Sequence, residues 1–562
     1  MGRKDWGAIL VLLVLTAALY GVGMGAFGFL DPDEPFYALT AKEMLQRGDL
    51  WRPVLFGEPQ FEKPVFFYWV LYLSFKCFGV NEFAARVGPC LAGVLTVLLV
   101  YLWGKTLFRK RGPAFISAAV LATAVEFLIL CRVAMTDVFL CLFVTAALCA
   151  FSAGYTDERR RPAAWLLVFF FCGLGFLTKG PLGILLPFLG IVPYLLLSGE
   201  RHLLKEIPWG RGLALFALVA FPWYVFMAKE HGPGFLRHFF VHENVRRFFV
   251  AEHRNSDKIF FYPIGVWAGF FPWSAFLPAV VSYGLKRVLR PPSPAQKSFL
   301  FLALCSFLPF AFFMLAKSKL FSYVFPVFPP MALMTGAWLY RFLRLKGDVQ
   351  GAGLRFWTVL FWGAAPLLAL AGAVGYGAEN RVDLWRPVAV LGVVFVPFCW
   401  AALFCFWKGR RRWALAGILL GMVSFAWGVF GMLVPRTDGG FSAKKAVAFY
   451  RDFVKEDKPS FFLASKLFVR GVAYYAGSEK VGVLTGNPKR AFYTRHPLPF
   501  FSTLDDLLKI EREKFPVYCF LRQKDLQFLR SIVDHRFGVA IVWSDAERVI
   551  AKLDRADHDQ NP

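Results

Sequence analysis

The chain has 562 residues, of which 57% are hydrophobic and 18% are charged, and its formal net charge is +26. This composition is too apolar for a soluble globular protein and is typical of a polytopic membrane protein. The Lys and Arg residues gather in short clusters between apolar stretches, such as those at 109–111 and 159–161. Because such clusters concentrate in cytoplasmic loops and attract anionic lipids, we assign the charge to membrane topology and expect no nucleic-acid partner.

The first apolar stretch, 7–28, follows two basic residues and has no convincing cleavage site after it, so we expect a retained helix with a cytoplasmic N-terminus. Similar stretches recur along the chain and predict about thirteen transmembrane helices. The others are expected at 87–107, 113–131, 138–155, 163–178, 181–198, 212–228, 259–284, 298–316, 320–340, 355–376, 386–407 and 413–434. Every second loop is strongly basic. With an odd number of predicted helices and a cytoplasmic N-terminus, the loops at about 29–86 and 229–258 are expected on the outer face.

The segment 438–562 differs in character from the transmembrane domain expected over 1–437, because charges of both signs are mixed along it. Helical patterns alternate in this segment with short strand-like runs. The helices are expected at 444–454 and 504–514, and the strands at 460–464, 481–484, 515–520 and 539–543. The pattern predicts a soluble α/β domain on the outer face, long enough to have its own core.

Two charged turns lie on the first outer loop. Asp33 and Glu34 stand between Pro32 and Pro35, and about thirty residues on the run Phe61-Glu62-Lys63-Pro64 places another charged pair beside a proline. Desolvating a charge near a membrane costs several kcal/mol, so charged groups at such positions usually have a function. Two rigid, charged turns on one loop predict an active site.

The histidines offer one constellation, in the second outer loop. His238 and His242 are four residues apart, so they share one face if the segment is helical, and Glu243 is adjacent. This spacing can bind zinc. A histidine pair on an interfacial amphipathic helix is the structural alternative.

Taken together, these motifs resemble those of bacterial polyprenyl-phosphate-dependent glycosyltransferases of the GT-C type. The likeness is greatest to the transferases of 4-amino-4-deoxy-L-arabinose (aminoarabinose) to lipid A, which are related to the protein O-mannosyltransferases. The motifs that carry it are Asp33-Glu34-Pro35-Phe36-Tyr37, Phe61-Glu62-Lys63-Pro64, Thr178-Lys179-Gly180-Pro181, His242-Glu243-Asn244, Phe271-Pro272-Trp273 and Lys317-Ser318-Lys319-Leu320. The resemblance covers about residues 1–345.

The resemblance implies transfer, with inversion, of a sugar from polyprenyl (undecaprenyl) phosphate on the outer face of the bacterial inner membrane. Transfer of aminoarabinose to lipid A is the leading expected reaction, and transfer to a protein acceptor is the alternative. The basic loops predict membrane lipids as surroundings, and with the odd number of spans they predict a periplasmic C-terminal domain. The sugar and the acceptor themselves stay open at the level of sequence.

A departing phosphate needs cations, and the developing positive charge on the sugar needs carboxylates. Lys63 suits the phosphate, because Pro64 fixes its backbone and aromatic neighbours suit a polyprenyl chain. By resemblance, Tyr323 and either Arg246 or Arg247 complete the phosphate site, and Lys319 is a further candidate.

The acids are assigned by the same reasoning. Asp33 would act as a general base on an acceptor hydroxyl, or as an orienting group if the acceptor is an ionised phosphate. Asp137 is the second candidate acid, and Glu34 is grouped with them while helping to fix the turn. The chemistry requires no cofactor, although the resemblance allows a divalent cation such as zinc between Glu62 and His242.

Each candidate also has a structural alternative. Asp33 could cap a helix that runs to about Arg47, and Asp137 could pair with Arg132. Lys63 and Lys319 could extend from helix ends toward lipid headgroups, and Tyr323 could belong to an aromatic belt. For the whole chain the alternatives are a secondary transporter, whose paired halves we do not find, and a scaffold, which leaves the charged outer loop without a function.

Overall fold

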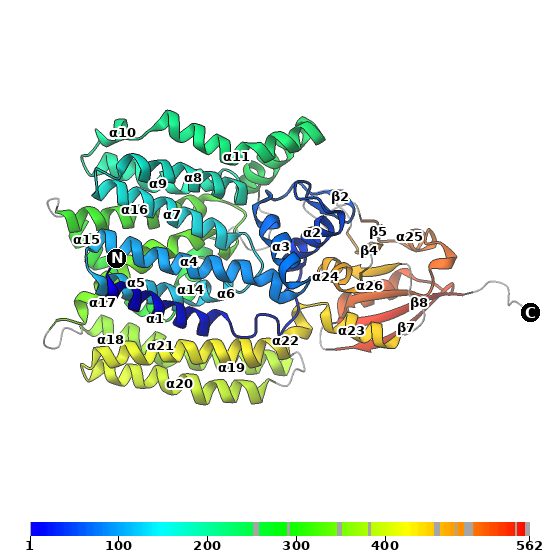
Figure 1. The fold of residues 1–562 in the computed structure, drawn as a ribbon. Coiled ribbons are helices and arrows are strands. Elements are labelled where there is room, and N and C mark those ends of the chain that lie inside the picture. Colours follow the sequence, from blue (N-terminus) through cyan, green and yellow to red (C-terminus); the bar gives the residue numbers. More distant parts are fainter. Residues whose placement is uncertain are drawn as a thin grey trace, which may run out of the picture.

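The computed structural model describes residues 2–250, 258–288, 293–345, 351–379, 384–454, 461–477, 480–487, 498–545 and 548–556. A bundle of roughly parallel and antiparallel helices forms one part of the molecule, and a mixed α/β domain caps one end of that bundle (Figure 1). The N-terminus lies at the other end of the bundle. The predicted class, a helical membrane domain with a C-terminal α/β domain, is confirmed. Residues 251–257 of the second expected outer loop lie outside the described ranges.

Eight helices within the described residues are long and apolar enough to cross a membrane, and a ninth is counted if one bent pair is a single span. The predicted total of about thirteen is therefore not confirmed. The bent pair, Phe261–Gly269 and Trp273–Arg287, turns by 110° inside the span expected at 259–284. The span expected at 113–131 is divided into α5 (Arg111–Thr123) and α6 (Val125–Leu130), with extended backbone at Ala124. Apolar composition alone does not reveal such breaks.

Most of the other helices of the bundle overlap the expected apolar stretches, whereas five short ones lie between or beyond those stretches, at 203–206, 233–236, 237–246, 247–249 and 434–441. In chain order, these other helices are α1 (Arg3–Tyr20), α4 (Glu82–Phe108), α7 (Asp137–Thr156), α8 (Arg161–Lys179), α9 (Leu182–Leu197), α10 (Leu203–Glu206), α11 (Trp209–His231), α12 (Pro233–Leu236), η1 (Arg237–Arg246), α13 (Arg247–Phe249), α14 (Phe261–Gly269), η2 (Trp273–Phe276), α15 (Leu277–Val288), α16 (Pro294–Leu315), η3 (Phe321–Val327), α17 (Phe328–Phe342), α18 (Ala352–Thr358), η4 (Val359–Ala364), α19 (Ala365–Glu379), α20 (Trp385–Trp407), α21 (Arg411–Gly428), η5 (Val429–Leu433) and α22 (Val434–Phe441).

The first outer loop folds into two helices, α2 (Asp33–Arg47) and α3 (Phe66–Phe78), joined by a small hairpin of β1 (Val54–Leu55) and β2 (Glu58–Pro59). Acidic residues begin α2, where they suit the positive end of the helix dipole. Gly48 ends it with φ of 67°, a left-handed conformation that glycine adopts without strain. The loop lies between the bundle and the C-terminal domain (Figure 1).

A buried ion pair anchors this loop to the bundle. Arg86 of α4 donates two hydrogen bonds to the Glu34 carboxylate, at 2.9 and 2.6 Å, and both side chains are fully buried. The same guanidinium donates to three backbone carbonyls of residues 24–28, and Glu34 accepts from the backbone N–H groups of Leu30 and Ala134. The pair thus satisfies several polar groups at once, as buried charges require.

The C-terminal domain has a six-stranded sheet within the described residues, in the order β5-β4-β3-β6-β8-β7. Strands β3, β4, β5 and β6 are parallel, whereas β8 is antiparallel to β6 and β7. Its elements are α23 (Lys444–Phe453), β3 (Phe462–Ser465), α24 (Val469–Ala476), β4 (Val481–Leu484), β5 (Phe500–Phe501), α25 (Leu504–Leu508), η7 (Arg512–Lys514), β6 (Val517–Arg522), α26 (Gln523–Ile532), β7 (Phe537–Ser544) and β8 (Arg548–Arg555). The four predicted strands are present. Strands β5 and β8 are not among the predicted strands. Strand β5 has only two residues and shows no pattern, whereas the apolar run at 549–551 could have indicated β8.

Polar contacts hold the C-terminal domain against the first outer loop. Lys42 of α2 donates to the carbonyl of Tyr474 at 2.9 Å, and the hydroxyl of Tyr475 donates to Glu82 at 2.8 Å. The guanidinium of Arg470 lies 4.7 Å from the ring centre of Phe36. These contacts place α24 directly over the loop that carries Asp33.

Candidate active site

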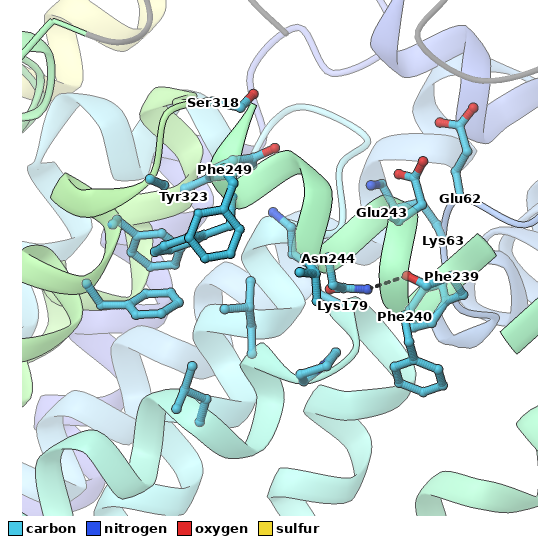
Figure 2. Close-up of a pocket in the computed structure, with 18 of the residues that line it drawn as sticks. Glu62, Lys63, Lys179, Phe239, Phe240, Glu243, Asn244, Phe249, Ser318 and Tyr323 are labelled. Carbon is cyan, nitrogen blue, oxygen red and sulfur yellow. Dashed lines mark hydrogen bonds between the residues drawn. The ribbon is translucent and has the colours of Figure 1, made fainter. Parts of the chain in front are cut away.

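Two cavities meet beside the first outer loop. The apolar cavity has a volume of about 410 Å³, and the charged cavity has a volume of about 500 Å³. Both are lined by Glu62, Lys63, Lys179 and Tyr323, which therefore lie between them. Glu62 and Lys63 come from one turn before α3, whereas Lys179 ends α8 and Tyr323 lies in η3; Figure 2 labels all four. A ligand with an apolar tail and a charged head would extend from one cavity into the other.

The apolar cavity is walled by aromatic side chains from η1, α13 and α16. They are Phe239, Phe240, Phe248, Phe249, Phe312 and Phe313. Asn244 of η1 donates a hydrogen bond to the carbonyl of Phe239 at 2.7 Å, which helps to fix this wall (Figure 2). Such a surface suits a long hydrocarbon chain better than a sugar.

Lys179 and Asp137 form an ion pair in the charged cavity. The Lys179 ammonium lies 2.6 Å from the Asp137 carboxylate and 4.5 Å from the ring centre of Tyr323. The structural alternative for Asp137 is wrong, because Arg132 instead donates to the carbonyls of Leu19 and Tyr20. Asp137 thus lines the site as predicted.

Lys179 is a site residue that the sequence reasoning did not single out. It ends α8, and Gly180 follows with φ of 66°. Its pairing with Asp137 spans 42 positions of sequence. The available signal was a lysine at the end of an apolar helix, inside a motif that contributed to the family resemblance.

Asp33 and Glu34 are neighbours in sequence but face different surroundings. Asp33 is exposed and lines the charged cavity, whereas Glu34 is buried against Arg86 and lines neither cavity. Glu34 was grouped with the catalytic residues; its carboxylate instead holds the turn. Asp33 is the first residue of α2 and not its N-cap, which is Pro32, so the capping alternative is wrong.

The predicted phosphate ligands divide into two groups. Lys63 and Tyr323 line both cavities. Lys319 is only 3% exposed, so it does not extend into lipid headgroups, yet it lines neither cavity. Arg246 is exposed and lines neither. The side chain of Arg247 lies outside what the structure describes.

The histidine pair and Glu243 lie together on η1, a π-helical segment. Ligand atoms of His238, His242 and Glu243 are all within 4.8 Å of one another, and His242 Nδ1 is 3.3 Å from the Glu243 carboxylate. Imidazole nitrogens and a carboxylate are suitable zinc ligands. Among the described residues this group includes Glu243 in place of the predicted Glu62. Glu62 and Glu243 nevertheless line the same cavity, and Figure 2 shows both carboxylates at one end of it.

Known proteins resemble this chain in sequence. Residues 62–226 match the family described as Dolichyl-phosphate-mannose-protein mannosyltransferase. An undecaprenyl phosphate-alpha-4-amino-4-deoxy-L-arabinose arabinosyl transferase of Pseudomonas aeruginosa (strain UCBPP-PA14) is 33% identical over 416 residues, which cover 73% of this chain and 72% of the relative. The transferase of the same name from Erwinia tasmaniensis is 29% identical over 440 residues, or 76% of both chains.

The fold is similar to a solved structure as well. The crystal structure of ArnT from Cupriavidus metallidurans bound to undecaprenyl phosphate superposes with a TM-score of 0.75, at 19% identity, over 98% of both chains. The likeness extends through the C-terminal domain, so the two-part architecture is shared. With the sequence relationship to the arabinosyl transferases, it decides against the transporter and scaffold alternatives. This chain is therefore a multi-pass membrane glycosyltransferase that belongs to the undecaprenyl phosphate-aminoarabinose arabinosyl transferase family.

Proposed function

We propose that this protein transfers aminoarabinose from undecaprenyl phosphate to a phosphate of lipid A, on the outer face of the bacterial inner membrane. The observation that carries the proposal is that the apolar and charged cavities are adjacent and share Lys63, Lys179 and Tyr323 as lining residues. The aromatic wall suits the polyprenyl chain, and Asp33 stands in the adjoining cavity where the sugar would lie. The names of the relatives support the choice of sugar and carrier.

The reaction is a single displacement at the anomeric carbon. An oxygen of the acceptor phosphate forms the new bond to that carbon, and the bond to the donor phosphate oxygen breaks, so undecaprenyl phosphate leaves with the electron pair. Lys63 and Lys179 hold the charge of the leaving phosphate, aided by the Tyr323 hydroxyl. Attack from the opposite side inverts the configuration. An ionised phosphate needs no general base, so Asp33 orients the sugar and stabilises its developing positive charge.

The transfer uses only side chains of this chain and needs no cofactor. His238, His242 and Glu243 nonetheless fit a divalent cation such as zinc, by their donor atoms and their spacing. Such an ion would supply structural cross-linking within η1, beside the phosphate site. In this proposal His242 is a metal ligand together with His238 and Glu243.

The direct test is transfer by the purified protein. The protein, in detergent or nanodiscs, is mixed with undecaprenyl phosphate-linked aminoarabinose and lipid A, and the products are analysed by mass spectrometry. We expect lipid A to gain one aminoarabinose and undecaprenyl phosphate to be released in equal amount. Modification of a periplasmic protein in place of lipid A would favour the protein-acceptor alternative.

Lys63→Ala is expected to weaken binding of undecaprenyl phosphate, because it removes a cation from the wall that the two cavities share. The loss should be about 1.5 to 3 kcal/mol, the range for a hydrogen bond to a charged group. Binding is measured as a dissociation constant at fixed ionic strength. Lys76→Ala, at an exposed position of α3, is the control. An unchanged constant for Lys63→Ala would assign that lysine to the lipid-headgroup alternative.

The proposed orientation predicts which positions an impermeant thiol reagent reaches. Single cysteines replace exposed residues in a variant that lacks the ten native cysteines, and intact cells with a permeabilised outer membrane are labelled. Glu58 of the first outer loop and Lys524 of α26 should label, whereas Arg160, in a basic cluster, should not. Protection of Glu58 together with labelling of Arg160 would invert the orientation and place the site in the cytoplasm.

A further inference from the structure

The C-terminal domain contributes a basic wall to the charged cavity, formed by Lys466, Arg470 and Arg522. Lys466 directly follows β3, Arg470 lies in α24, and Arg522 ends β6. Strand β6 pairs in parallel with β3 on one side of β3, whereas β4, the next strand in the chain, pairs with β3 on its other side. Ligands of such sheets bind beyond the carboxyl ends of the strands, at the point where the strand order reverses. The three cations lie at this point.

The cations are held in place by contacts from both domains. Asp525 accepts a hydrogen bond from Arg522 Nε at 3.0 Å and another from the Ser465 hydroxyl. The Ser465 hydroxyl in turn accepts from the backbone N–H of Arg522 at 3.0 Å, which joins the ends of β3 and β6. Arg470 packs its guanidinium on Phe36 of α2. Arg470 and Arg522 of the basic wall are therefore arranged before any ligand binds.

The basic wall brings three like charges together, although Arg522 is paired with Asp525. Burial lowers the pKa of the Lys466 ammonium, and the nearby charges of Arg470 and Arg522 lower it further. The opposite wall carries the carboxylates of Asp33 and Glu62, whereas Asp137 is already paired with Lys179. An anionic group bound against the basic wall would relieve this repulsion.

We propose that Lys466, Arg470 and Arg522 bind the phosphate of the acceptor glycolipid, and so give the C-terminal domain its part in the reaction. This inference rests on the proposed function. Displacement with inversion requires the acceptor oxygen and the departing phosphate on opposite sides of the sugar. Lys63, Lys179 and Tyr323 line both cavities and face the donor phosphate, whereas the basic wall lines the charged cavity and not the apolar one. The two phosphates thus have separate cation sets.

The test measures binding of lipid A to the purified full-length protein, with phosphorylated and enzymatically dephosphorylated lipid A compared. The wild-type protein should bind the phosphorylated form at least about tenfold more tightly, as expected for charge-assisted hydrogen bonds. Arg522→Gln and Lys466→Gln should each remove most of that preference. Their dissociation constants for undecaprenyl phosphate should not change. Arg530→Gln, at an exposed position of α26 outside the cavity, is the matched control.

Arg470 is tested with two variants, because its packing on Phe36 also supports the contact between the C-terminal domain and α2. Arg470→Lys keeps the charge and should retain the preference for phosphate, whereas Arg470→Gln should lose it. If Arg470→Gln does not fold, the double variant Lys466→Gln with Arg522→Gln is used instead, and it should lose the preference for phosphorylated lipid A.

Two results would overturn the inference: full preference for phosphorylated lipid A in the variants, or weakened binding of undecaprenyl phosphate in its place. The second result would assign the basic wall to the donor. Failure of the proposed function has a different signature. In that case wild-type protein would bind phosphorylated lipid A through these cations and yet transfer no aminoarabinose to it.

Discussion

Asp33→Asn is expected to lower the transfer rate by about 100-fold or more, the usual effect of removing a positioned acid, base or electrostatic group. The substitution keeps the shape of the side chain and deletes its charge in the cavity where the sugar would lie. Asp33 is exposed to that cavity and is not the N-cap of α2, so the folded protein should lose little stability. Transfer is measured by release of undecaprenyl phosphate from the lipid-linked sugar, alongside thermal unfolding in detergent.

Asp452→Asn is the matched control for this experiment, because Asp452 is exposed on α23 and lies outside both cavities. Its transfer rate should equal that of the wild-type protein. Full activity in purified Asp33→Asn would remove both the orienting and the basic role from this carboxylate. Lost activity together with a lowered unfolding temperature would point to a structural role instead.

Glu34→Gln is expected to destabilise the protein by about 3 to 5 kcal/mol, the range for breaking a buried ion pair from one side. The change leaves the guanidinium of Arg86 buried and without its carboxylate partner. It also weakens the link between the first outer loop and α4, and with it the positions of Asp33 and Lys63. Thermal unfolding of the purified protein, monitored in detergent, measures the effect.

Glu58→Gln provides the comparison, since Glu58 is exposed on β2 of the same outer loop and should leave the unfolding temperature nearly unchanged. If Glu34→Gln unfolds like the wild-type protein but transfers no sugar, Glu34 acts in the chemistry and not in the structure.

Much of the architecture was predictable because its signals are local in sequence. Runs of apolar residues indicated the membrane helices, and short strand-like runs indicated the four predicted strands of the C-terminal domain. The charged turns at Asp33 and Lys63 stood out since burying charge near a membrane is costly. The number of spans was less predictable. An apolar stretch has the same composition whether its helix is straight, broken as at Ala124, or bent by 110° between α14 and η2.

The sequence by itself determined the membrane class, the family resemblance, and the charged loop that carries Asp33 and Lys63. Only the tertiary structure separated Asp33 in the cavity from Glu34 against Arg86, and paired Asp137 with Lys179. It alone brought the basic wall of the C-terminal domain over the same cavity. Burial and electrostatic pairing depend on distances between segments far apart in the chain. The pattern of residues within one segment does not contain those distances, whereas the packing of the helices and the sheet fixes them.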